Sequence, residues 1–218
     1  MKLSNIKIPD KIKKRLEKDV KTLRPAQEKA VKQGLLDFKS QLICTPTASG
    51  KTFIAELAAI NHITNNKGKV IYIVPLKALA SEKFKNFKAR YENFFRIALS
   101  IGDRDGADAY LTEYDLIICT AEKLDSLIRH HTPWLKYVSL VVIDEIHLMN
   151  DPGRGPTLEI LITILREILK NVQIIGLSAT IGNPKELSTW LKAELVEDDW
   201  RPVKLHKGIY LDGKIEYY

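Results

Sequence analysis

Cysteine is scarce in this 218-residue chain, and the two that occur, Cys44 and Cys119, each lie in a short apolar run. Two such residues cannot form the disulfide framework of a small secreted domain, so we expect buried thiols in a reduced, cytoplasmic protein. The sequence has no apolar run of about 18 residues, which a membrane-spanning helix requires. Residues 1–18 also lack the apolar stretch of a signal peptide. We therefore expect no membrane partner.

Aromatic residues are also few, at 8% of the chain, and no block of them is placed for stacking on nucleobases. Phe84 and Phe87 follow helical spacing, which is more typical of a core than of a stacking platform. The sequence has no internal repeat and no low-complexity segment. Its apolar fraction of 45% is that of a globular core, and its length predicts one large domain, with or without a small appendage.

The net positive charge of the chain, +7, comes from two stretches. Residues 1–39 contain 12 Lys or Arg against 5 Asp or Glu, and residues 67–96 contain 8 against 2. Residues 97–218 are acidic, with 13 against 19. A polyanion would be attracted to the two basic stretches. Two solvated helix faces would give the same pattern, and charge alone favours neither interpretation.

Short apolar runs alternate with helical patterns through most of the sequence. The runs lie at 42–44, 70–74, 97–99, 116–119, 138–143 and 174–177. The helical patterns begin near Pro25, Thr52, Leu76, Pro156 and Asn183. Such alternation predicts an α/β fold with a mostly parallel sheet covered by helices on both faces. We expect an amphipathic lead-in at 1–22, the domain at 23–196 and a tail at 197–218 whose end packs poorly on the domain.

The helix that begins at Pro156 has apolar residues on two sides. Leu158, Leu161 and Leu165 form one side, and Ile160 and Ile164 form a second. A helix that is apolar on two sides is expected to be buried on both.

Each expected strand is followed by a polar cluster or a turn. These are Ser49–Thr52, Pro75–Lys77, Gly102–Asp103, Thr120–Lys123, Asp144–His147 and Ser178–Thr180. Ligands of open parallel sheets bind at the carboxyl ends of the strands. Six clusters along one edge therefore predict a ligand-binding surface there.

Residues 41–52, QLICTPTASGKT, predict a strand, a tight loop and the start of a helix. The unpaired N–H groups and the dipole at a helix start favour an anion. Gly50 lets the backbone approach a phosphate, Lys51 supplies charge for the terminal phosphates, and the hydroxyl of Thr52 is suited to Mg²⁺. Thr45 stands where the full phosphate-loop pattern has glycine, so the loop is a variant. A Lys-Thr pair capping an ordinary helix is the alternative interpretation.

Two carboxylates, Asp144 and Glu145, directly follow the most apolar run, Val138–Ile143. At the end of that strand Asp144 is placed to hold Mg²⁺ through water, and Glu145 is placed to orient or deprotonate an attacking water molecule. Without the phosphate loop upstream, a turn with two solvated carboxylates would be the better interpretation. With that loop, the pair predicts phosphoryl transfer to water.

Together, Gln27, TPTASGKT, VPLKAL, DEIH and SAT resemble the motifs of the first motor domain of superfamily 2 helicases. Three longer stretches, 153–159, 178–191 and 199–205, are similar to archaeal DNA-repair helicases of the Ski-like group, which are related to the helicase part of DNA polymerase theta. The resemblance covers essentially the whole chain. It implies a RecA-like P-loop NTPase domain that uses ATP and Mg²⁺, in an enzyme that moves 3′ to 5′ on single-stranded or branched DNA.

The resemblance also implies roles for single residues. Nucleotide binding would involve Gln27, which would recognise adenine, and Thr47, Ala48, Ser49, Gly50, Lys51 and Thr52. The catalytic residues would be Lys51, Asp144 and Glu145, with Thr52 and Asp144 at the metal. Coupling between nucleotide and nucleic acid would involve His147, Ser178 and Thr180.

Single-stranded nucleic acid would lie along Pro75, Lys77, Gly102, Asp103, Thr120 and Lys123 by the same resemblance. Turns at strand ends offer backbone N–H groups to phosphates without reading bases. Lys83, Lys85 and Lys88 would extend the positive charge. Asp103 cannot attract a phosphate, so we expect it to orient its turn.

The sequence departs from the family in its length. Helicases of this group have a second motor domain with an arginine finger, a winged helix, a ratchet domain and a strand-separating hairpin, and Arg201 is the only arginine after Thr180. We expect a first motor domain whose partner is the second motor domain of a longer chain, and very slow ATP hydrolysis by these 218 residues alone. An RNA helicase of the same group and a nucleotide-gated binding module without unwinding activity stay open as alternatives.

Overall fold

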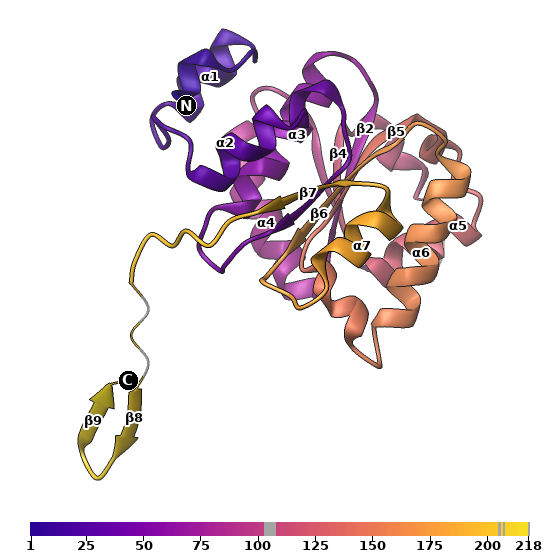
Figure 1. The fold of residues 1–218 in the computed structure, drawn as a ribbon. Coiled ribbons are helices and arrows are strands. Elements are labelled where there is room, and N and C mark those ends of the chain that lie inside the picture. The colour runs from indigo at the N-terminus through magenta and orange to yellow at the C-terminus, as the bar shows by residue number, and fades with distance from the viewer. Residues whose placement is uncertain (103–107, 205, 207, 218) are drawn as a thin grey trace.

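The structure is a computed structural model that describes residues 1–102, 108–204, 206 and 208–217 (Figure 1). Its strands are β1 (Gln41–Cys44), β2 (Lys69–Val74), β3 (Ile97–Ser100), β4 (Leu116–Thr120), β5 (Val138–Ile143), β6 (Gln173–Ser178), β7 (Glu194–Glu197), β8 (Gly208–Leu211) and β9 (Lys214–Tyr217). Its α-helices are α1 (Asp10–Leu16), α2 (Pro25–Lys32), α3 (Lys51–Thr64), α4 (Lys77–Tyr91), α5 (Ala121–Arg129), α6 (Gly155–Ile168) and α7 (Pro184–Leu191). None of the helices in these ranges is both long and apolar enough to cross a membrane.

The strands β1 to β7 form one sheet in the order β3-β4-β2-β5-β6-β1-β7, and every pairing in it is parallel. This confirms the predicted α/β fold. The central strands are buried along nearly their whole length, which is why they read as continuous apolar runs. Because all seven strands run the same way, their carboxyl ends share one edge of the sheet.

Helices cover both faces of this sheet (Figure 1). Successive residues of a strand point to opposite faces. Tyr72 and Val142 belong to the core that α1 to α4 cover, whereas Ile71 and Val141 belong to the core under α5 to α7. Each face therefore has its own hydrophobic core.

The lead-in packs on the α3 and α4 face. Ile6, Ile8, Ile12 and Leu16 are buried in the same core as α3. They follow the amphipathic pattern seen in the sequence, and they bring the basic stretch of residues 1–39 onto the domain.

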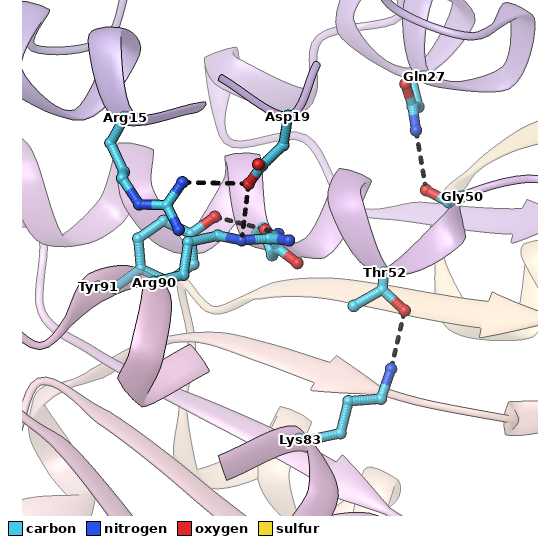
Figure 2. A network of polar contacts seen from close by, with 9 residues as sticks. Arg15, Asp19, Gln27, Gly50, Thr52, Lys83, Arg90 and Tyr91 are labelled. Atoms are coloured by element: carbon cyan, nitrogen blue, oxygen red, sulfur yellow. Dashed lines mark hydrogen bonds and ion pairs between the residues drawn. The ribbon is translucent and has the colours of Figure 1, made fainter. Parts of the chain in front are cut away.

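Ion pairs connect the lead-in to α3 and α4 (Figure 2). The Arg90 guanidinium lies 2.6 Å from the carboxylate of Glu56, which is 6% exposed, and 3.6 Å from that of Asp19. Arg15 pairs with the same Asp19 oxygen at 3.1 Å. The Tyr91 hydroxyl also donates to Glu56. Arg90 is therefore the cation that neutralises the buried Glu56 carboxylate.

His62 links α3 to the neighbouring strands β5 and β6. Its Nε2 lies 2.6 Å from Gln173 Oε1 and its Nδ1 lies 2.8 Å from Ser139 Oγ. Since the amide oxygen only accepts, the ring donates from Nε2 and accepts at Nδ1 in its neutral form. Burial lowers the pKa of His62, and the hydrogen bond to Gln173 opposes part of that change.

The exposure of one face of α6 contradicts the prediction that this helix is buried on both sides. Ile160 and Ile168 are 54% and 49% exposed, so the helix is not buried on its second side. Its other side, with Leu158, Leu161 and Leu165, packs on the sheet. The physical reason is that helices cover each face of the sheet in a single layer, and no described element lies over the outer side of α6.

The predicted tail begins where the last strand of the main sheet ends. Strand β7 pairs with β1 at the edge of the main sheet. Strands β8 and β9 pair only with each other, antiparallel, and their side chains are exposed, including Ile209 and Tyr210. This hairpin stands clear of the main sheet (Figure 1).

Candidate nucleotide site and nucleic-acid edge

The predicted clusters line the carboxyl edge of the sheet in two groups. The turns predicted to contact nucleic acid follow β3, β4 and β2, which are neighbours in the sheet. The phosphate loop and the carboxylates predicted for the nucleotide site follow β1 and β5, and the turn predicted for coupling follows β6, which lies between them. The strand order therefore separates the two predicted binding regions. The nucleic-acid half of the edge lies at β3, β4 and β2, and the nucleotide half lies at β5, β6 and β1.

The phosphate loop joins β1 to α3. Gly50 has a φ of 94°, in the left-handed region that favours glycine, and a Cβ there would lie 2.6 Å from Gln27 Nε2. Thr45 Oγ1 lies 2.7 Å from Ser49 Oγ, and both residues are buried. Thr45 stands where the common pattern has glycine, and its hydroxyl braces the loop. Thr47 and Ala48, by contrast, are exposed at the tip.

Lys51 is folded into this loop. Its ammonium donates to the carbonyl oxygen of Thr45 over 2.9 Å. Burial lowers the pKa of Lys51, and the nearby charges of Glu145 and Asp144 act in the opposite direction. The ammonium can exchange a backbone carbonyl for a phosphate oxygen without leaving the loop.

Gln27 connects α2 to the phosphate loop (Figure 2). Its Oε1 accepts from the Arg24 N–H at 2.9 Å, and its Nε2 donates to the Gly50 oxygen over 3.0 Å. Arg24 in turn donates to the Ala48 oxygen over 2.7 Å. Pro25 at the first position of α2 fixes the start of the helix that carries Gln27. The role of Gln27 in adenine recognition stays a prediction, and its place beside the loop is compatible with it.

Three groups hold the carboxylate of Asp144 at the end of β5. The Tyr72 hydroxyl donates to Oδ2 over 3.0 Å, and the Glu145 N–H donates to Oδ1 over 3.1 Å. The Lys83 ammonium lies 3.1 Å from Oδ2. Burial and the charge of Asp144 raise the pKa of Tyr72 well above its usual range, so the phenol remains a donor.

The same Lys83 ammonium donates to Thr52 Oγ1 over 2.8 Å (Figure 2). Thr52 and Asp144 are the two residues predicted to hold Mg²⁺, and a single cationic group joins them here. A hydroxyl and a carboxylate are oxygen ligands of the kind that Mg²⁺ prefers, so the donor set fits the ion.

Sequence reasoning missed Tyr72 and assigned Lys83 to a nucleic-acid patch. Signals for both were present. Tyr72 is the one residue with a polar side chain in the apolar run 70–74. Lys83 has helical spacing from Ala80 and Phe87, both buried, so it is a lysine on a core-facing side of α4.

Glu145 and His147 lie next to the carboxyl end of β6. Glu145 has a φ of 54°, a left-handed conformation that is strained for a residue with a side chain and is enriched at functional sites. His147 Nδ1 lies 3.3 Å from Glu145 Oε2 and 3.4 Å from the Ala179 nitrogen. One ring nitrogen either accepts from the Ala179 N–H or, when protonated, donates to Glu145. His147 can therefore make only one of these two hydrogen bonds at a time.

The turn after β6 also contacts the phosphate loop. The carbonyl oxygen of Ser178 accepts from the Thr45 N–H at 3.3 Å, and Thr180 is exposed. A line of contacts thus runs from Glu145 through His147 and the turn to the loop. The structure brings together the residues predicted for coupling, with Thr180 at the solvent side.

The turns predicted to contact nucleic acid follow β2, β3 and β4. Pro75 precedes α4, Lys77 is its exposed first residue, and Gly102 is exposed after β3. Asp103 lies outside the described residues.

After β4 the predicted residues are engaged with each other. Thr120 caps α5, and its Oγ1 accepts from the Lys123 N–H at 3.4 Å. The Lys123 ammonium is 3.1 Å from Asp108 Oδ2, and the residue is 7% exposed. Its charge is thus neutralised within the chain, and its contact with nucleic acid stays a prediction.

Comparison with known proteins gives the same family as the motifs. A family model described as DEAD/DEAH box helicase matches residues 24–187. The ATP-dependent DNA helicase Hel308 of Methanocaldococcus jannaschii is 62% identical over 204 residues, which cover 89% of this chain and 17% of that protein. The protein of the same name from Pyrococcus horikoshii is 50% identical over 214 residues, which cover 98% of this chain and 30% of that protein.

A solved structure is similar over nearly the same residues. It is the DUF1998 helicase MrfA bound to DNA, with a TM-score of 0.76 and 27% identity, and the match covers 88% of this chain and 30% of that one. The chain therefore spans between 17% and 30% of the length of these three proteins.

Proposed function

The chain belongs to the DEAD/DEAH box helicase family, and we propose that it is the first motor domain of an ATP-dependent DNA helicase. The observation that carries the proposal is the division of one sheet edge. The phosphate loop follows β1, Asp144 and Glu145 follow β5, and the Ser178–Thr180 turn follows β6 between them, whereas the turns at Pro75, Gly102 and Thr120 follow the adjoining three strands. A motor needs both ligands on one rigid frame, so that a change at one can reach the other.

The nucleotide half has the parts for ATP hydrolysis. Lys51 and the N–H groups at the start of α3 bind the phosphates. Thr52 and Asp144 hold Mg²⁺, which neutralises phosphate charge when it is bound. Glu145 orients a water molecule or accepts its proton, and Gln27 lies at the side of the loop where it can contact adenine.

The other half offers backbone groups to a nucleic acid. The starts of α4 and α5 present N–H groups, with Lys77 beside the first of them. The relatives are named DNA helicases and the similar structure is bound to DNA. This supports single-stranded or branched DNA as the partner.

The same proposal includes a second motor domain and a cytoplasmic location. The family resemblance gives the arginine finger to that second domain, and Arg201, the only arginine after Thr180, is exposed beyond the main sheet. Cys44 and Cys119 are free and buried, as expected in a reducing compartment. Burial raises the pKa of Cys119 to about 12, which keeps the thiol unreactive.

Nucleotide-dependent binding of DNA tests the proposal. Fluorescence anisotropy would follow a labelled single-stranded DNA oligonucleotide with the chain alone, with ADP and with a non-hydrolysable ATP analogue. We expect the nucleotides to change the DNA affinity of the parent chain and to leave that of Lys51→Ala unchanged. A parent chain that binds no nucleotide contradicts the motor function. A matched RNA strand that competes better than DNA replaces DNA with RNA as the partner.

A further inference from the structure

A lysine occupies the position between the two predicted metal ligands. The Lys83 ammonium is 2.8 Å from Thr52 Oγ1 and 3.1 Å from Asp144 Oδ2, and its side chain is 18% exposed. It also lies 5.6 Å from the centre of the Tyr72 ring, over its face. A hydroxyl, a carboxylate and an aromatic face all attract a cation. The ammonium is therefore bound as a cation, and it does not merely extend into solvent.

We propose that Lys83 is an internal counter-ion that holds the metal position closed until a nucleotide brings Mg²⁺. This inference rests on the proposed Mg²⁺ site. An ammonium and a divalent ion cannot share the same two oxygens, because like charges at that separation repel each other. Free Mg²⁺ has to displace Lys83 from Thr52 and Asp144 without any phosphate ligand to compensate for the lost ion pair. Mg²⁺ that arrives on a nucleotide adds phosphate ligands, so it displaces the lysine at a lower concentration.

A cavity beside Lys83 can accept its side chain after displacement. Lys83 and Thr52 line an open cavity of about 500 Å³ together with Arg15, Glu56, Glu82, Asn86, Phe87, Ala89 and Arg90. Glu82 and Asn86 are exposed on the same helix. Rotation about the lysine side chain moves the ammonium from Asp144 towards these acceptors without unwinding α4.

Helix α4 connects Lys83 to the half of the edge that is predicted to contact nucleic acid. The helix begins at Lys77, in the turn predicted to contact nucleic acid, and Lys83 is six residues further on. At about 1.5 Å of rise per residue the two side chains are joined by less than two turns of helix. Release of Lys83 removes one contact of α4 with Thr52 of α3 and with Asp144, while Arg90 and Tyr91 still bind Glu56 of α3. Metal loading therefore reaches the strand-binding turn through one rigid element.

Thermal unfolding with free Mg²⁺ tests the counter-ion directly. The variants are Lys83→Gln and, as a matched control on the exposed side of α4, Lys85→Gln. A ligand that binds only the folded state raises the melting temperature according to its affinity. We expect Mg²⁺ without nucleotide to stabilise Lys83→Gln at a concentration at least about fivefold lower than it needs for the parent, the lower end of typical coupling between two sites. The Lys85→Gln variant should match the parent.

Calorimetry of ADP binding with and without Mg²⁺ separates this inference from the proposed function. If Mg²⁺ tightens ADP binding in all three proteins but free Mg²⁺ affects them equally, the metal site stands and the counter-ion role of Lys83 is wrong. If Lys83→Gln loses ADP affinity in the absence of Mg²⁺, the lysine binds phosphate and the inference is also wrong. If Mg²⁺ changes ADP binding in none of them, the proposed metal site itself fails.

A measurement on the parent chain covers the case in which the variant does not fold. Acetylation of lysines followed by mass spectrometry reports how accessible each ammonium is. Mg²⁺ with ADP should increase the labelling of Lys83 several-fold relative to the ligand-free chain and leave that of Lys85 unchanged. Unchanged or reduced labelling of Lys83 would overturn the displacement.

Discussion

The phenol of Tyr72 donates a hydrogen bond to Asp144 Oδ2 over 3.0 Å, from the middle of an otherwise aliphatic strand. Tyr72 is completely buried, and Asp144 directly follows the neighbouring strand β5. The parallel register of β2 and β5 places Tyr72 beside Val142, two residues before Asp144 on the same face of the sheet. A residue of the hydrophobic core therefore orients the predicted metal ligand.

Replacement of Tyr72 by phenylalanine tests this relationship. The loss of one hydrogen bond to a charged group should lower the free energy of unfolding by about 1.5–3 kcal/mol. Affinity for Mg²⁺-nucleotide should fall by about tenfold or more, as is usual when the residue that orients a metal ligand is lost. Denaturant unfolding and calorimetry measure the two effects. Tyr137→Phe, at an exposed tyrosine, is the control and should change neither.

Gln27 is expected to distinguish adenine from guanine. Its amide has both a donor and an acceptor, so it can pair with the N6 and N7 edge of adenine. We expect ATP or ADP to bind the parent more tightly than GTP or GDP, and Gln27→Ala to abolish the difference. The variant should also lose about 1 kcal/mol of stability, because the hydrogen bond to Gly50 is lost. Equal affinities of the parent for both purines, measured by calorimetry, would contradict the adenine role.

Arg90 and Arg15 are predicted to differ sharply in their contribution to stability. Arg90→Met leaves the Glu56 carboxylate buried without its cation, which typically costs about 3–5 kcal/mol. Arg15→Met removes only a partly exposed pair with Asp19, which is typically worth less than about 1 kcal/mol. Urea denaturation of the two variants measures the contrast. Similar losses in both would show that Arg90 is not the essential partner of Glu56.

The lowered pKa of His62 predicts that mild acidification decreases the stability of the fold. Its pKa in the folded chain is lower than its ordinary value of 6.5, so the unfolded chain binds the additional proton below that pH. Stability contributed by the neutral ring is complete above about pH 6.5 and decreases as the pH falls towards the lower folded pKa. The slope is at most about 1.4 kcal/mol per pH unit for one proton. In His62→Gln the unfolding free energy should change less between pH 6.5 and 5, and the same slope in both proteins would exclude His62 as its source.

The chain alone should bind Mg²⁺-ATP and hydrolyse it very slowly. An arginine finger contributes roughly 10³–10⁵-fold to rate in related phosphoryl-transfer enzymes. Arg201 is the only arginine after Thr180, and it lies in the exposed segment after β7. Single-stranded DNA should therefore stimulate hydrolysis little. Rapid DNA-stimulated turnover that Glu145→Gln abolishes would show that these residues contain a complete catalytic site.

The sequence was sufficient to predict strands β1 to β6 and to propose the residues of the nucleotide half of the edge, but it missed β7, in which only Val196 is buried. Continuous apolar runs such as Val138–Ile143 have few alternatives to a buried strand, and a loop such as Ser49–Thr52 has a well-defined function at a strand end. Local spacing determines both features. The strand order, which divides the edge between the two predicted ligands, depends on pairings between distant segments and has no local signal.

The contacts of Lys83 and Lys123 could not be predicted for the same reason. Helical spacing can place Lys83 on the core-facing side of α4, but the carboxylates that pair with the two lysines, Asp144 and Asp108, come from elsewhere in the chain. For the outer side of α6 the prediction was wrong in the opposite sense, because residues predicted to be buried are exposed. The apolar character of Ile160 predicts burial, but exposure depends on whether another layer covers the helix.

Strand β1, which leads into the phosphate loop, pairs with β6 and β7, the last two strands of the main sheet in the sequence. During synthesis on the ribosome, β1 emerges first of all the strands and has neither neighbour until residues 173–197 have followed. Its apolar residues Leu42 and Ile43, which have no exposed surface in the folded chain, are therefore available to chaperones throughout that interval. A nascent chain that stalls before Gln173 has no partner for either edge of this strand. We therefore expect nucleotide binding at the proposed site to begin only when nearly all of the domain has been made, so that ATP would be a ligand of the finished fold and not of its growing intermediates.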